Sequence, residues 1–249
     1  MPFRMPSFEN WIACAAISLM MYVVASLRSS RLRGLVVSMP IPLTLVLWSQ
    51  PEMQITAGHV LGMLLLVGFF WSNWVLYSKL CLPIAVSMLI AIGSYIFAGS
   101  LTRCASSAPY LYALAFAVVW LVYVRVFYRV SHQTVDTDQV PAWVKACGTF
   151  VICAFFFSLR ETIGPALATA PLVSTFSIVE CRKVLKTICL EFTRNVIGIV
   201  AYFVVYATVP GPFWVRTATS WAVLFVMLGF ARMATSRRVP RVEVTMSEG

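Results

Sequence analysis

The sequence predicts an all-α polytopic membrane protein with about nine transmembrane helices. Of its 249 residues, 60% are hydrophobic and only 11% are charged. A soluble domain carries roughly a quarter charged residues, and a disordered chain combines low hydrophobicity with high charge. The composition therefore excludes both classes. Helices are predicted rather than barrel strands, because the apolar runs approach the roughly 20 residues that a helix needs to cross a bilayer.

Nine apolar segments follow one another along the chain. They cover residues 11–27, 34–48, 55–77, 80–101, 110–127, 143–159, 164–179, 185–209 and 213–231. The second and the seventh are short, and each contains two prolines. Because proline removes a backbone donor and disrupts the preceding turn of a helix, we expect both to be broken helices.

The basic residues indicate an orientation in the membrane. The net charge is +10, and the chain has 19 Lys and Arg residues. With nine spans, fourteen of them fall on one face and four on the other, and Arg194 lies inside a span. Positive residues accumulate on the cytoplasmic side, so this division predicts an external N-terminus and a cytoplasmic C-terminus. Because membrane orientation explains the excess positive charge, we expect no nucleic-acid partner.

Short matches between the two halves predict an internal repeat. The triplet Ser-Leu-Arg occurs at 26–28 and again at 158–160, and each copy is followed by Gly and then by a proline-broken segment. Phe-Ala at 97–98 recurs at 230–231. Four spans, one linking span and four further spans place the second copy upside down, which is a common plan of secondary transporters. The expected units are residues 1–108, a linker helix and cytoplasmic loop at 109–141, an inverted repeat at 142–232, and a basic disordered tail at 233–249.

The repeated stretches also resemble a known family. Residues 34–77 and 164–207 each combine a Gly-led, proline-broken helix with a following helix, which opens with Leu-Lys-Thr-Ile at 185–188 in the second copy. This pattern resembles the GlpM-like family of small bacterial membrane proteins. The resemblance implies two fused units in inverted orientation, and we expect a multi-pass protein of the bacterial inner membrane.

Ionisable residues within a span are costly and mark candidate functional sites. Span eight contains Glu191, Arg194 and Asn195, and Glu191 and Arg194 share a helical face. Glu191 is a candidate proton-coupling carboxylate and Arg194 a candidate solute ligand, with Asn195 beside it. The alternative is a structural ion pair near the interface. His59 lies 132 positions before Glu191 and is a second proton-coupling candidate; alternatively it donates to a carbonyl within the bundle.

Polar and proline residues of the broken segments are the other predicted solute ligands. Solute sites of inverted-repeat transporters lie where discontinuous helices meet. The candidates here are Pro42, Thr44, Pro171, Ser174 and Thr175. The alternative for each hydroxyl is a hydrogen bond to its own helix.

These observations predict a secondary transporter of a small anionic or zwitterionic solute that works by alternating access with proton coupling. The alternative is a non-transporting membrane subunit, or a lipid-modifying enzyme that binds an anionic headgroup through Arg194, Glu191 and the basic cluster near residue 182. The sequence has no nucleophile, phosphate-loop or metalloprotease motif, and its seven cysteines form no CxxC pair. We therefore expect no catalytic residues, no metal and no cofactor. The expected partners are membrane lipid and the solute, and a homo-oligomer is left open.

Overall fold

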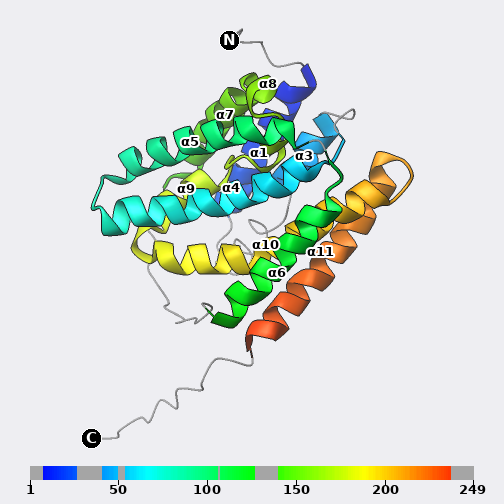
Figure 1. The fold of residues 1–249 in the computed structure, drawn as a ribbon. Coiled ribbons are helices and arrows are strands. Elements are labelled where there is room, and N and C mark those ends of the chain that lie inside the picture. Colours follow the sequence, from blue (N-terminus) through cyan, green and yellow to red (C-terminus); the bar gives the residue numbers. More distant parts are fainter. Residues whose placement is uncertain (1–7, 27–40, 50–53, 106, 127–139, 237–249) are drawn as a thin grey trace, which may run out of the picture.

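The computed structural model describes residues 8–26, 41–49, 54–105, 107–126 and 140–236, and every regular element in these ranges is helical (Figure 1). The helices of the first half are α1 (Phe8–Ser26), α3 (Ile41–Ser49), α4 (Ala57–Trp74) with the π-helical turn η1 (Val75–Lys79), α5 (Ile84–Leu101), η2 (Thr102–Cys104) and α6 (Tyr110–Val126). Those of the second half are α7 (Ala142–Ser158), α8 (Arg160–Ile163), the 3₁₀ helix η3 (Gly164–Thr169), α9 (Ser174–Glu180), η4 (Arg182–Val184), α10 (Leu185–Thr208) and α11 (Phe213–Ser236).

Five stretches of the described chain are long and apolar enough to cross a membrane. They are Phe8–Ala25, Ala57–Lys79, Ile84–Cys104, Arg182–Thr208 and Phe213–Ala234. A sixth candidate is α7 together with Arg160–Thr169, which is bent by 62°. Helix α6 is apolar but shorter. The chain is therefore a helical membrane protein with five or six candidate spans in its described part, and the expected count of nine is not reached.

The two proline-broken segments and the short helix α6 account for the missing spans. Of residues 34–48, only the part from 41 on is described, and α3 has nine residues, which is about 14 Å of helix at 1.5 Å per residue. Residues 164–179 are divided between η3 and α9. Pro40, the loop at 127–139 and residues 237–249 of the predicted tail lie outside the described residues. The tail was expected to begin at 233, whereas α11 continues to Ser236, with no proline to end it before position 240.

Helices α4 and α10 form an antiparallel pair in the middle of the fold. At one end, the rings of His59 and Phe203 lie 5.4 Å apart between their centroids. At the other end, Trp71 Nε1 donates to Thr193 Oγ1 at 3.1 Å. The residue numbers of the contacting pairs therefore rise along α4 while they fall along α10, so the two helices run in opposite directions. Helix α6 packs on both members of the pair.

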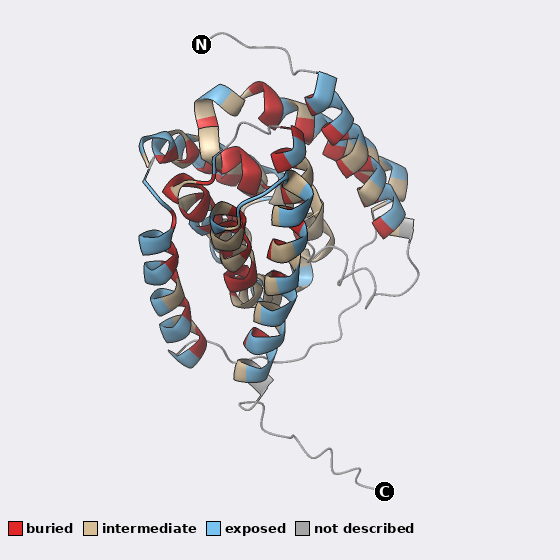
Figure 2. Ribbon diagram, turned by 90° about the vertical axis from the view of Figure 1, so that its right-hand side faces the viewer, coloured by how far each residue is buried: buried red, intermediate tan, exposed pale blue. Residues whose placement is uncertain are grey.

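The remaining helices are arranged around this pair. Helix α1 packs along α7, α5 folds back on α4, and α11 folds back on α10 (Figure 1). The buried residues lie on the inward faces, whereas long outward faces are exposed (Figure 2). These outward faces are apolar, as shown by Leu89 at 71% exposed and Val226 at 71% exposed. Exposed apolar area on this scale is typical of lipid-facing helices.

Candidate functional site

The two proline-broken segments meet in the structure. Helix α3 packs against η3, and both lie near the N-terminal end of α4 and the C-terminal end of α10. We call this region the junction and define it by α3, η3, the first turns of α4 and the last turns of α10. The segments that the sequence singled out as solute-binding are thus adjacent, although they are 115 or more positions apart in the chain.

Helices α4 and α5 hold η3 closely. Gly58 and Gly62 face it, and a Cβ on Gly58 would lie 2.8 Å from Pro165 Cγ, while one on Gly62 would overlap Thr169 Oγ1. From α5, Tyr95 OH donates to the carbonyl of Ala166 at 2.7 Å and lies 2.9 Å from Thr169 Oγ1. The broken segment of the second half is therefore bound by the α4–α5 hairpin of the first half.

Helices α10 and α11 contact α3 through one side chain, Thr44. Trp221 Nε1 on α11 donates to Thr44 Oγ1 at 3.1 Å. The hydroxyl of Tyr202 on α10 lies 3.3 Å from the same oxygen. These two contacts link the broken segment of the first half to the α10–α11 hairpin of the second half, whereas its more extensive packing is against α1 and η3. Thr44 is a predicted solute ligand, and the structure places it at the centre of this contact.

His59 lies in the first turn of α4, at the junction, and is fully buried. The backbone N–H of Thr56 donates to its Nδ1 at 3.1 Å. A neutral imidazole that accepts at Nδ1 carries its proton on Nε2. Within the described residues that Nε2 has no hydrogen-bond partner. A buried donor without a partner costs about 1–3 kcal/mol, so His59 offers a donor for a bound group at the junction.

The other candidates from the broken segments lie around the beginning of α9 and in the first turn of α3. Pro171, Ser174 and Thr175 stand at the beginning of α9, where Thr175 Oγ1 donates to the carbonyl of Pro171 at 2.8 Å. This hydroxyl is thus used within its own segment, and Ser174 is half-buried. Pro42 is half-buried in the first turn of α3.

Glu191, Arg194 and Asn195 form a local network on α10. Arg194 and Glu191 are ion-paired, and Arg194 Nε donates to Asn195 Oδ1 at 3.1 Å. The side chain of Arg194 is 13% exposed and that of Glu191 is 33% exposed. Glu191 precedes Phe203, the residue against His59, by twelve positions on α10, which is about 18 Å of helix. The structure therefore does not bring Glu191 and His59 together.

A buried ion pair was not predicted from the sequence. Lys145 on α7 is ion-paired with Glu180 at the end of α9, and their side chains are 4% and 13% exposed. Glu180 Oε1 also accepts the backbone N–H of Val140 at 3.1 Å. This pair connects the start of α7 to the end of the second broken segment. Its only sequence signal is the presence of two isolated charges beside apolar runs.

The contacts that bind the broken segments were also missed. Tyr95, Tyr202 and Trp221 were seen only as aromatic residues of apolar spans. The pattern Gly58-x-x-x-Gly62 is a sequence signal that predicts a close helix contact in membranes. It would have directed attention to the face of α4 that receives η3. No group of three or more His, Cys, Asp or Glu side chains capable of holding a metal occurs in the described part of the chain.

Comparisons of the chain with protein-family models, with curated proteins and with solved structures find no match. The resemblance to the GlpM-like family therefore stays a prediction.

Proposed function

We propose that this chain is a secondary transporter of a small anionic or zwitterionic solute, built from two inverted halves that each contribute one discontinuous helix to the solute site. The observation that carries the proposal is the reciprocal binding of the broken segments. The hairpin α4–α5 packs on η3 from the other half, and Tyr202 of α10 and Trp221 of α11 contact Thr44 of α3 from the other half. Contacts in which the broken segment of each half meets the opposite half are expected when a two-fold axis in the membrane plane relates the halves.

The antiparallel course of α4 and α10 supports the same plan. Between them the chain passes through α5, α6 and α7, which alternate in direction if each crosses the membrane. Helix α10 then opposes α4 only if residues 164–184 cross once more. Six residues of 3₁₀ helix and seven residues of α-helix supply about 22 Å at standard rises, and the four linking residues turn between them. The hydrocarbon core is about 30 Å thick, so the crossing also needs the linking residues and the turn η4 that follows α9.

The chemistry of the junction suits a small polar solute. Unpaired backbone groups of a broken helix are tolerated in a membrane only inside protein or beside a wet cavity. The Nε2–H of His59 and the hydroxyl of Thr44 supply directed polar groups there. We propose that these two residues contact the solute and that His59 or Glu191 carries the coupled proton. The basic residues orient the chain with its N-terminus outside and its C-terminus in the cytoplasm of a bacterial cell.

A flux assay tests this function. The purified protein is reconstituted in liposomes that contain a pH-sensitive dye, and L-alanine, L-glutamate, succinate or inorganic phosphate is added outside. We expect a saturable proton flux with at least one of these probes. Thr44→Val removes a hydroxyl contact of about 1.4 kcal/mol and should lower the flux about tenfold.

The matched control is Thr219→Val, because this exposed hydroxyl on α11 donates only to the carbonyl of Val215 in its own helix. Its flux should equal that of the unmodified chain. Flux no greater than in protein-free liposomes for every probe would contradict the proposal. Equal losses in the two Thr variants would remove Thr44 from the solute site.

A further inference from the structure

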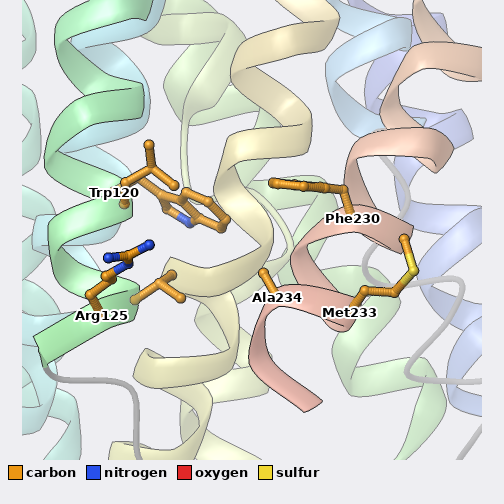
Figure 3. Close-up of a pocket in the computed structure, with 7 residues that line it drawn as sticks. Trp120, Arg125, Phe230, Met233 and Ala234 are labelled. Carbon is orange, nitrogen blue, oxygen red and sulfur yellow. The ribbon is translucent and has the colours of Figure 1, made fainter. Parts of the chain in front are cut away.

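A second site lies away from the junction, between α6 and α11. A cavity of about 550 Å³ opens there, lined by Trp120, Leu121 and Arg125 of α6 and by Phe230 and Ala234 of α11. Figure 3 shows Trp120 and Phe230 on the two facing helices, with α10 behind the gap between them. The volume is within the range of about 300–1,000 Å³ that is typical of ligand sites.

The walls of this groove continue into the lipid-facing surface. Leu121 is 50% exposed, Phe230 is 48% exposed, and Met233 beside it is 65% exposed. Because the chain is a helical membrane protein, apolar side chains that are half exposed on these two helices face acyl chains rather than water. The groove is therefore a recess in the lipid-facing surface of the protein.

One end of the groove is positively charged. Arg125, near the end of α6, is the one charged residue among those that line the cavity. Helices α6 and α11 finish at the same end of the molecule (Figure 1), so Arg232 of α11 belongs to that end as well. A recess that is apolar along its length and cationic at its end is complementary to an acyl chain joined to an anionic headgroup.

We propose that this groove binds one anionic phospholipid, with an acyl chain between Trp120 and Phe230 and the phosphate on the guanidinium of Arg125. A long Arg side chain at a helix end can extend to the headgroup region while its stem packs on apolar surface. Trp120 is fixed for this role, because its Nε1 donates to the backbone carbonyls of Thr193 and Arg194 on α10. The site is independent of any transport activity.

Native mass spectrometry of the full chain tests the proposal. The protein is purified in detergent and exposed to equal amounts of phosphatidylglycerol and phosphatidylcholine. We expect one phosphatidylglycerol to be retained in preference. Arg125→Gln should lower this preference about fivefold, the contribution of one basic residue near an anionic lipid. The control Lys79→Gln removes an exposed cation at the end of η1 and should leave the preference unchanged.

A second pair of variants tests the apolar part of the site. Ala234→Phe fills the groove and should abolish retention of the lipid, whereas Ala218→Phe, an exposed position on the same helix, should not. Equal retention of the two lipids, or equal effects of the two cation variants, would overturn the proposal. It would also be overturned if the chain is a dimer that Ala234→Phe dissociates, since the groove would then be an interface between two copies.

Discussion

Gly62→Ala is the substitution that most directly perturbs the contact between the halves. A methyl group on Gly62 would overlap Thr169 Oγ1 and would lie 3.3 Å from Ala166 Cα. Thr169 is fully engaged, because its hydroxyl donates to the carbonyl of Ala166 at 3.1 Å and lies 2.9 Å from Tyr95 OH. The clash therefore requires either a displacement of η3 or a rotation of Thr169 that breaks these bonds.

The change in the free energy of unfolding follows from these two ways of relieving the clash. Overpacking a close contact costs about 1–3 kcal/mol. Rotation of Thr169 sacrifices one or two hydrogen bonds at about 1 kcal/mol each. Against this, Gly→Ala inside a helix is worth about 0.5–1 kcal/mol in favour of folding. We expect a net destabilisation of about 1–2 kcal/mol.

The assay is reversible unfolding in mixed micelles, followed by circular dichroism. Gly68→Ala is the matched control, because it lies in the same helix and a Cβ there meets nothing within 4 Å. It should stabilise the protein by about 0.5–1 kcal/mol. The double variant Gly62→Ala/Thr169→Ala removes the overlap and should recover part of the loss. Equal effects of Gly62→Ala and Gly68→Ala would refute the close contact between α4 and η3.

Three further predictions concern single side chains. Thr44→Val should destabilise the protein by about 1–3 kcal/mol, because it leaves the indole N–H of Trp221 without its acceptor, and Thr44→Ser should restore most of the loss in the same unfolding assay. Lys145→Met should lower the free energy of unfolding by about 3–5 kcal/mol, because it removes the ion-pair partner of Glu180, whose side chain is 13% exposed, and adding Glu180→Gln should recover stability; additive effects in the double variant would disprove the pair. Glu191→Gln should change stability by less than about 1 kcal/mol because the pair is partly exposed, and a larger loss would show that it is structural.

The sequence predicts the helical membrane class and most helix positions, because these depend on local properties. Runs of apolar residues and the turn at Pro210, Gly211 and Pro212 locate α10 and α11 to within a few residues. The number of spans is harder to predict from the sequence, because a proline-rich segment divides into short helices whose path depends on what packs against them. Residues 164–179 illustrate this, because η3 is fixed by α4 and α5 and not by its own composition.

The candidate site is predicted only in part for a related reason. Thr44 was selected because it lies in a broken segment, which is a local property. Its partners Tyr202 and Trp221 are 158 and 177 positions away, and nothing in their immediate sequence distinguishes them from other aromatic residues of the spans. The offset of 132 positions between His59 and Glu191 did not imply proximity, because Glu191 lies twelve positions, about 18 Å of helix, before Phe203, the residue against His59.

The central claim is that residues 164–184 cross the membrane and so invert α10 relative to α4. Cysteines at Glu161 and at Lys183, introduced after the exposed Cys81, Cys104 and Cys147 and the half-buried Cys181 are replaced by Ser, test it with a membrane-impermeant thiol reagent in right-side-out and inside-out vesicles. The account predicts that Glu161→Cys is labelled only from the outside and Lys183→Cys only from the cytoplasmic side. Labelling of both positions from one side would mean that this segment enters and leaves the same face, which contradicts the inverted arrangement.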